Sequence, residues 1–183
     1  MTLPELFISV DIEANGPTPG EYSMVSLGAC LVGRPEESFY VELKPLNDRF
    51  DRKALSVSGL TMEHLREMGE EPAAATARFV RWVEEKAGAT HRPVFVAFNA
   101  TFDWMFVHWY LIRFVGKSPF GVSGLDIKAY FMGMDGCAWG DTRKSDVRRR
   151  FPPRQAHTHH ALEDAREQAE IFAQMLAGRS RKA

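Results

Sequence analysis

The chain has 183 residues, 45% of them hydrophobic, which is enough to bury the core of one domain without disulfide or metal support. Its net charge of −1 gives no indication of a polyanionic partner at the level of the whole molecule. The two cysteines, Cys30 and Cys137, are far apart and lack metal-ligand spacing, which argues against a disulfide framework or a zinc site. With no leader peptide and no run of roughly 20 apolar residues, we expect a cytoplasmic protein with no membrane partner.

The N-terminal part of the chain predicts three strands. Residues 6–12 and 24–32 are apolar runs of strand length, separated by a stretch rich in glycine and proline. Residues 38–43 alternate apolar with polar or amphipathic side chains, the period of a strand that has one covered face, and Pro45 ends this pattern. Consecutive strands with short connections pair with each other, so we expect these three to be antiparallel.

Helices and strands alternate in the rest of the chain. The spacing of apolar residues predicts a helix over 73–86, a strand over 94–98, a helix over about 101–115, a brief strand over 125–127 and a last helix from near His160. Residues 133–158 lack a regular pattern, apart from a possible short helix over 142–150. This order predicts an α/β protein with a mixed five-stranded sheet, its three N-terminal strands antiparallel, flanked by helices.

A basic cluster lies within residues 143–154. Six cations against the single acid Asp146 give it a local charge of +5; they are Arg143, Lys144, Arg148, Arg149, Arg150 and Arg154. Lysine and arginine neutralise the phosphates of nucleic acids, so the cluster favours such a partner, with Arg148, Arg149 and Arg150 as candidate contacts. The alternative is a solvated helix face. Residues 179–183 form a second, short basic tail, which we expect to be a frayed terminus.

Acidic residues end the first predicted strand and begin a predicted helix. Asp11 and Glu13 are two residues apart, so both side chains leave the same face of the strand. Asp103 has apolar neighbours at helical spacing, and burial there would cost several kcal/mol unless a cation, a proton or a metal compensates its charge. The alternatives are an exposed strand end for the first pair and, for Asp103, a favourable interaction with the helix dipole.

A fourth acid, Asp164, follows a histidine-rich segment at the start of the last helix, where the alternative is a surface acid favoured by the helix dipole. Residues 157–160 contain three of the six histidines in the chain, a pattern typical of metal binding or proton transfer, although an exposed loop would also tolerate it. The four acids occur at strand ends and helix starts, which can meet at one edge of a sheet. Their oxygen ligands favour Mg²⁺ or Mn²⁺ over zinc.

In order and spacing, these residues resemble the DEDDh family of 3′-to-5′ exonucleases, which includes polymerase proofreading subunits, RNase T and oligoribonuclease. The family motif D-x-E is matched at residues 11–13, followed by Gly16 where the family usually has a glycine. The motif N-x-x-F-D is matched at residues 99–103, and H-x-A-x-x-D at residues 159–164. The resemblance spans residues 6–176 and implies a ribonuclease H-like fold, with one exonuclease domain over residues 1–178.

Further segments fit the resemblance, and one departs from it. Residues 54–65 correspond to a helix-turn-helix stretch of the family, and residues 144–151 to a short helix before the catalytic histidine. After Glu13 the family commonly has Thr-Thr-Gly, whereas this chain has Ala14, Asn15 and Gly16. The departure removes a hydroxyl that lies near the terminal nucleotide in the family.

The resemblance also implies roles for single residues. Two divalent cations, Mg²⁺ or Mn²⁺, would be held by four acids: Asp11, Glu13, Asp103 and Asp164. His159 would be the general base. Four further residues would contact the substrate or position it: Ala14, Asn15, Gly16 and Asn99. The implied partner is nucleic acid, as single-stranded 3′ ends of DNA or RNA or as short oligonucleotides, and similar proteins form homodimers. The products would be 5′-mononucleotides.

Two other functions are compatible with the same residues. One is a nucleic-acid-binding module of this fold that has lost its activity, although the presence of all four acids and the histidine argues against it. The other is a metal-dependent hydrolase of small nucleotides. The basic cluster argues against this function, because it favours a polymer or oligomer as the substrate. Helix spacing alone would select His160 as the base, because it precedes Asp164 by four residues, whereas the motif selects His159.

Overall fold

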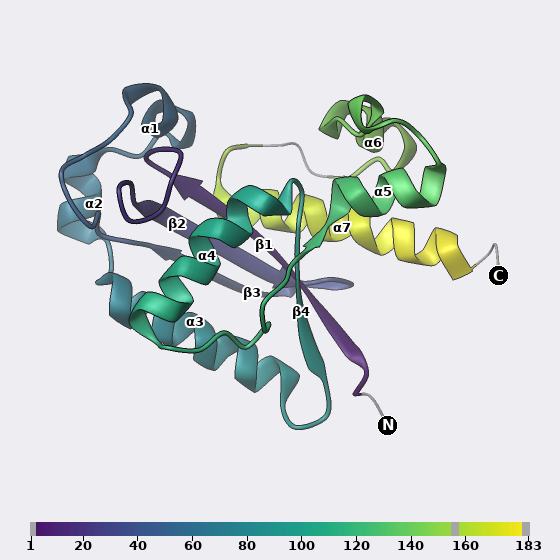
Figure 1. Cartoon of the computed structure of the whole chain (residues 1–183), viewed down its shortest axis with the longest axis horizontal. Helices are drawn as coiled ribbons and strands as arrows, with labels where there is room; N and C mark the ends of the chain where they lie inside the picture. Colours follow the sequence, from purple (N-terminus) through teal and green to yellow (C-terminus); the bar gives the residue numbers. More distant parts are fainter. Residues whose placement is uncertain (1–2, 155–157, 181–183) are drawn as a thin grey trace.

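The computed structural model describes residues 3–154 and 158–180, which contain a five-stranded sheet in the order β3-β2-β1-β4-β5 (Figure 1). Strands β1 (Glu5–Ala14), β2 (Met24–Leu31) and β3 (Arg34–Glu42) are antiparallel, as the sequence predicts. Strands β4 (Arg92–Ala97) and β5 (Leu125–Asp126) continue the sheet parallel to β1. The expected mixed five-stranded sheet, with its three N-terminal strands antiparallel, is therefore confirmed.

Helices cover both faces of the sheet, so the protein has three layers. Helices α3 (Pro72–Ala87) and α4 (Ala100–Phe114) pack on one face, and α7 (Ala161–Ser180) packs on the other (Figure 1). The smaller helices are α1 (Arg52–Ser58) and α2 (Met62–Met68) after β3, and α5 (Ile127–Asp135) and α6 (Lys144–Arg150) near α7. Within the described ranges, none of the helices has the length and apolar character needed to span a membrane.

Strand β1 separates apolar from polar side chains between the two layers of helices. Ile8, Val10 and Ile12 are buried in the core that α3 and α4 cover. The alternate residues point the other way, because successive side chains of a strand leave opposite faces. Among them, the Ser9 hydroxyl donates a 2.8 Å hydrogen bond to the carbonyl of Ala165 on α7. This alternation directs the two acids of the strand toward α7.

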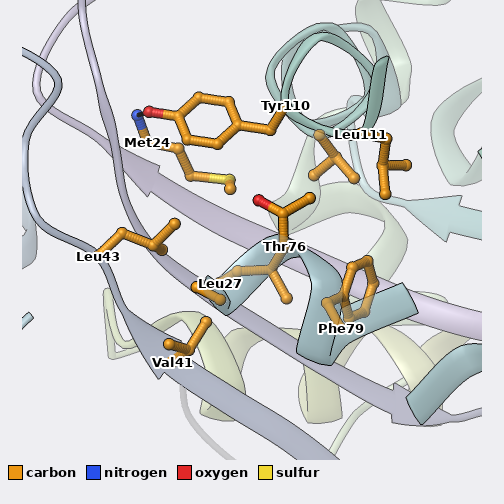
Figure 2. A pocket seen from close by; sticks show the side chains of 10 residues that line it. Met24, Leu27, Val41, Leu43, Thr76, Phe79, Tyr110 and Leu111 are labelled. Atoms are coloured by element: carbon orange, nitrogen blue, oxygen red, sulfur yellow. Dashed lines mark hydrogen bonds between the residues drawn. The ribbon is translucent and has the colours of Figure 1, made fainter. Parts of the chain in front are cut away.

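The apolar layer between the sheet and helices α3 and α4 fixes α4 in place (Figure 2). The Tyr110 hydroxyl of α4 accepts a 2.9 Å hydrogen bond from the amide of Met24 on β2. Phe79 of α3 and Leu111 of α4 line the same small cavity, whose volume of about 10 Å³ is at the limit for one water molecule. We interpret this cavity as a packing defect of the core and not as a ligand site.

Helix α5, the start of β3 and the end of α7 differ from the sequence expectation. Helix α5 was not expected, although the Asp126 side chain caps it by accepting from the amide of Ala129 at 2.7 Å and Gly136 ends it in a left-handed conformation. Strand β3 begins at Arg34, four residues earlier than its alternating pattern indicates. At the C-terminal end of the chain, α7 continues to Ser180, two residues into the expected basic tail. Residues 181–183 lie outside the described residues.

Candidate active site

The C-terminal end of β1 carries the first two acids of the site. Asp11 and Glu13 are on the face of the sheet that α7 covers, and both are partly buried. The pairing between β1 and β2 shifts register between Glu13 and Ala14, an irregularity that is common next to active sites. Strand β1 thus places two carboxylates together, directly before this irregularity.

The first turn of α4 brings the third acid to the same end of β1. Asn99 adopts a left-handed conformation with φ of 66°, which turns the chain from β4 directly into α4. Asp103 is 5% exposed, and its Oδ1 atom accepts a 3.1 Å hydrogen bond from the amide of Ile12. This bond ties the start of α4 to the strand that carries Asp11 and Glu13.

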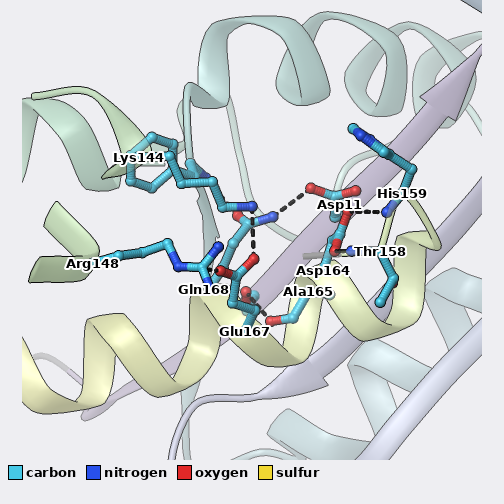
Figure 3. Close-up of polar contacts among 11 residues, drawn as sticks. Asp11, Lys144, Arg148, Thr158, His159, Asp164, Ala165, Glu167 and Gln168 are labelled. Atoms are coloured by element: carbon cyan, nitrogen blue, oxygen red, sulfur yellow. Dashed lines mark hydrogen bonds and ion pairs between the residues drawn. The ribbon is translucent and has the colours of Figure 1, made fainter. Parts of the chain in front are cut away.

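The start of α7 rests directly on β2 and carries the fourth acid. A Cβ atom on Gly28 would lie 2.3 Å from the backbone of Ala161, so only glycine allows this contact. Asp164 is 1% exposed, and its two oxygens accept hydrogen bonds from the amides of Thr158 and His159 at 3.0 and 3.1 Å (Figure 3). The same carboxylate therefore reaches the site and fixes the histidine loop.

The two histidines that precede α7 have different surroundings. One ligand atom each of Glu13, His159 and Asp164 lies within 4.8 Å of the others, an arrangement that can hold a metal ion. His160 instead stacks on the ring of Tyr40, with ring centres 4.5 Å apart and planes inclined by 22°. The structure therefore brings His159 to the acids and directs His160 to β3. His157 lies outside the described residues.

Burial and mutual repulsion make the carboxylates of this cluster hard to ionise. Burial raises the pKa of Asp11 well above its usual value, and the neighbouring acids raise it further. The pKa of Glu13 is raised to about 7, mainly by burial and also by Asp164. Burial raises the pKa of Asp103 to about 8, although the amide of Ile12 opposes this shift. A divalent cation would relieve this repulsion, and the oxygen donors fit Mg²⁺ or Mn²⁺.

Gln168, which is fully buried on α7, was not expected at the site. Its amide nitrogen donates a hydrogen bond to Asp11 Oδ1, and its oxygen accepts one of 2.5 Å from the amide of Phe98 (Figure 3). Gln168 thus holds the Asp11 carboxylate in place. The available signal was its spacing, because it follows Asp164 by four residues and shares its helix face.

The residues after Glu13 that were expected to contact substrate are buried. Ala14 is 7% exposed and Asn15 fully buried, and the Asn15 side chain accepts a 2.7 Å hydrogen bond from the amide of Ser23. A Cβ atom on Gly16 would lie 2.0 Å from the ring of Tyr22, which explains the glycine. The structure therefore gives the Asn15 side chain a role inside the fold. Asn99, in contrast, is exposed.

The three arginines expected to bind substrate are all in ion pairs. Arg148 Nε lies 3.2 Å from Oε1 of the buried Glu167 on α7. Arg149 pairs with Asp146, and Arg150 pairs with Asp135. Arg149 and Arg150 also line a hollow whose lining contains none of the four clustered acids. The structure thus brings the four acids and His159 together but not these two arginines.

Sequence comparisons identify nucleases over nearly the whole chain. A family model described as an exonuclease matches residues 8–172. The curated relative 3′-5′ DNA exonuclease Cap18 of Escherichia coli is 41% identical over 168 residues, which is 92% of this chain and 90% of the relative. The region matched by the family model contains all four acids of the carboxylate cluster.

Solved structures show the same fold at lower identity, which confirms the expected ribonuclease H-like fold. The nuclease domain of 3′hExo, a DEDDh family member bound to rAMP, has a TM-score of 0.76 and 13% identity, covering 94% of this chain and 92% of that one. E. coli Exonuclease I in complex with a dT13 oligonucleotide has a TM-score of 0.72 and 17% identity, covering 97% of this chain and 42% of that one.

Proposed function

The chain belongs to the exonuclease family and is thus a hydrolase of the nuclease class, and from this premise we propose that it is a metal-dependent 3′-to-5′ exonuclease acting on DNA. The substrate would be a single-stranded 3′ end, and the products would be 5′-mononucleotides. The identity of 41% to a 3′-5′ DNA exonuclease supports DNA as the substrate class.

The convergence of the predicted catalytic residues carries this proposal. Asp11 and Glu13 come from β1, Asp103 from α4 and Asp164 from α7, yet they lie close enough that the charges of the other three acids add to the effect of burial in raising the pKa of Asp11. His159 lies beside Glu13 and Asp164 at the open side of the cluster, where it is exposed. Structural packing alone gives no reason to place four acids together.

The four acids would hold two divalent cations, Mg²⁺ or Mn²⁺. When bound, such cations supply Lewis acidity and neutralise charge that develops on the phosphate group. Their ligands would be Asp11, Glu13, Asp103 and Asp164. Gln168 would keep the Asp11 carboxylate oriented toward the cations, because its amide donates to Oδ1.

His159 would take the proton from the water that attacks the scissile phosphodiester. A general base must be within hydrogen-bond reach of that water, and the left-handed backbone at His159 directs the residue toward the acids. Asp164 supports this role, since it accepts hydrogen bonds from the amides of His159 and Thr158 and so fixes the loop. His160, stacked on Tyr40, takes no part in the proposed reaction.

The remaining predicted contacts belong to the same proposal. Arg148, Arg149 and Arg150 would contact phosphates farther along the strand, Arg149 and Arg150 in exchange for their present partners and Arg148 while it keeps its ion pair with Glu167. Asn99, exposed at the start of α4, would line the entrance for the terminal nucleotide. Ala14, Asn15 and Gly16 would shape this entrance through their backbone, since their side chains are buried.

The polarity and substrate class can be tested with a panel of labelled strands. We expect 5′-labelled single-stranded DNA to shorten progressively in Mg²⁺ or Mn²⁺, and a strand with a blocked 3′ end to persist. Single-stranded RNA and free nucleotides, tested in parallel, would reveal a different substrate class. Cleavage of a circular strand into internal fragments would refute the exonuclease assignment.

A further inference from the structure

Glu167 is a fully buried carboxylate for which the proposed reaction has no use. It lies on α7, three residues after Asp164, and its side chain has no exposed surface. A buried carboxylate requires nearby cations or donors to compensate its charge. Two cations of α6 provide this: Lys144 Nζ lies 2.8 Å from Glu167 Oε2, and Arg148 Nε lies 3.2 Å from Oε1. Glu167 therefore fixes α6 against α7 one turn away from Asp164.

The ammonium group that Glu167 holds lies at the edge of the carboxylate cluster (Figure 3). Lys144 Nζ is 5.9 Å from the ring centre of Phe98, whose amide donates to the same Gln168 that holds Asp11. The positive charge of Lys144 lowers the pKa of Asp11, Glu13 and Asp103. This effect opposes the larger effect of burial, which raises all three pKa values. The Lys144 side chain is 24% exposed, so a bound strand can reach it.

We propose that Lys144 is a substrate-binding residue whose ammonium contacts a non-bridging oxygen of the scissile phosphodiester, and that Glu167 is the positioning residue that aims it. The inference rests on the proposed function. Two divalent cations would only balance the four carboxylates, so a bound phosphodiester adds one further negative charge, and a fixed cation beside the acids stabilises it. An ammonium group has three N–H donors, so it can bind Glu167 and a phosphate oxygen at the same time.

The main test is Lys144→Gln, assayed on single-stranded DNA at saturating metal. We expect KM to rise about 10- to 100-fold, the loss typical of a charge-assisted hydrogen bond, with kcat changing much less. The dependence of log KM on log salt concentration should become shallower by about one, because one phosphate contact is lost. An unchanged KM and an unchanged slope would overturn the inference.

A matched control separates this contact from a general loss of positive charge. Lys117, after α4, is also ion-paired, with Nζ 2.6 Å from Glu84 Oε1, and its side chain is 61% exposed. Lys117→Gln removes the same charge and should leave KM within about twofold of wild type. Lys144→Arg should recover part of the lost affinity. If Lys117→Gln and Lys144→Gln raise KM equally, the effect of Lys144 is long-range electrostatics and not a direct contact, which contradicts the proposal.

The role of Glu167 can be tested by a double-mutant cycle. Glu167→Gln should raise KM in the same direction as Lys144→Gln, because the ammonium loses the partner that aims it. If Glu167 acts through Lys144, the double variant should have the KM of Lys144→Gln alone. Fully additive effects would show that Glu167 supports the site by another route and would remove it as the positioning residue.

A neutral linkage identifies the phosphate that Lys144 contacts. A strand with a methylphosphonate at its 3′-terminal linkage serves as a competitive inhibitor, and its inhibition constant should be the same for wild type and Lys144→Gln. A weaker inhibition of Lys144→Gln would place the contact elsewhere and overturn the assignment to the scissile group. A strand whose methylphosphonate lies one linkage further from the 3′ end keeps a charged, cleavable terminal linkage, so its KM should, in contrast, differ between the two proteins.

Metal binding provides a readout that does not depend on activity. In a calorimetric titration with Mn²⁺, Lys144→Gln should bind at least as tightly as wild type, because a positive charge beside the ligands is removed. A severalfold weaker affinity would mean that Lys144 maintains the geometry of the site, which contradicts a direct substrate contact. If the wild type degrades no DNA, the proposed function fails. If it degrades DNA and Lys144→Gln matches Lys117→Gln, this inference alone fails.

Discussion

The backbone of His159 has a φ of 56°, a conformation that costs a non-glycine residue roughly 1 kcal/mol or more. The hydrogen bond from its amide to Asp164 Oδ2 offsets part of this cost. The strained position lets the side chain lie beside Glu13, whereas His160, the next residue, begins the approach to α7 and stacks on Tyr40. The left-handed backbone at His159 thus directs the side chains of two adjacent histidines to different neighbours.

This separation predicts different effects for the two alanine variants. His159→Ala should lower kcat by about 10²- to 10⁴-fold, the usual range for a lost general base. His160→Ala should lower kcat by less than about threefold, because its ring packs on Tyr40 away from the acids. The measurement is kcat on a 5′-labelled strand at saturating Mg²⁺. A crippled His160→Ala with an active His159→Ala would select His160 as the base.

The raised pKa of Glu13 predicts how the metal-free protein depends on pH. Its pKa of about 7 in the folded protein lies above that of an ordinary glutamate, so the folded state binds the extra proton. The folded protein therefore loses stability as pH rises from about 4.5 to about 7, and the loss is complete above that range. Glu13→Gln should remove this loss and raise stability at pH 8 by on the order of 1 kcal/mol.

Thermal unfolding in EDTA at a series of pH values measures this effect. The gain of Glu13→Gln over wild type should be present at pH 8 and disappear below about pH 4.5. Glu85→Gln, at an exposed position of α3, is the matched control and should show little gain at either pH. A gain of Glu13→Gln that is equal at pH 4 and pH 8 would mean that its cause is packing and not ionisation.

At the scale of secondary-structure elements, the contact between α7 and β2 sets the position of the site. Gly28 lies in a strand whose residues are all buried, and a Cβ atom there would overlap the backbone of Ala161 and Leu162. Backbone cannot move aside as a flexible side chain can. The start of α7 would have to rise from the sheet, and Asp164 would move with it.

Gly28→Ala is therefore expected to destabilise the protein by about 1–3 kcal/mol and to weaken Mn²⁺ binding and activity together. Gly133→Ala is the matched control, since nothing lies within 4 Å of a Cβ atom at Gly133 in α5 and alanine favours a helix. Chemical unfolding and Mn²⁺ titration measure both properties. Normal stability and metal affinity in Gly28→Ala would show that α7 is not held at this contact.

At the scale of the whole molecule, local patterns in the sequence predict the sheet and the acids, because they depend on short periods. The two-residue period of β1 places Asp11 and Glu13 on one face, and the family motifs select Asp103 and Asp164. Contacts between distant segments have no such period. Lys144 and Glu167, for example, meet only because α6 folds back onto α7, and their pairing is invisible in the sequence.

The missed features at the site follow from the same limit. Gln168 is at helical spacing from Asp164, but its bond to Asp11 depends on how closely α7 approaches β1. The family resemblance predicts a substrate contact for Asn15, which stays a prediction, whereas the burial of its side chain depends on how the following loop returns to Ser23. Spacing along the chain predicts which residues share a face, and tertiary packing decides which of them reach the site.

The central claim is that the acids around Asp11 form the metal-dependent centre of a 3′-to-5′ exonuclease. The most direct measurement is a time course on 5′-labelled single-stranded DNA with wild type and Asp11→Asn, each in Mg²⁺ and in EDTA. We predict a ladder of strands shortened from the 3′ end for wild type in Mg²⁺, and an intact strand under the other three conditions. Shortening that persists in Asp11→Asn or in EDTA would contradict the account.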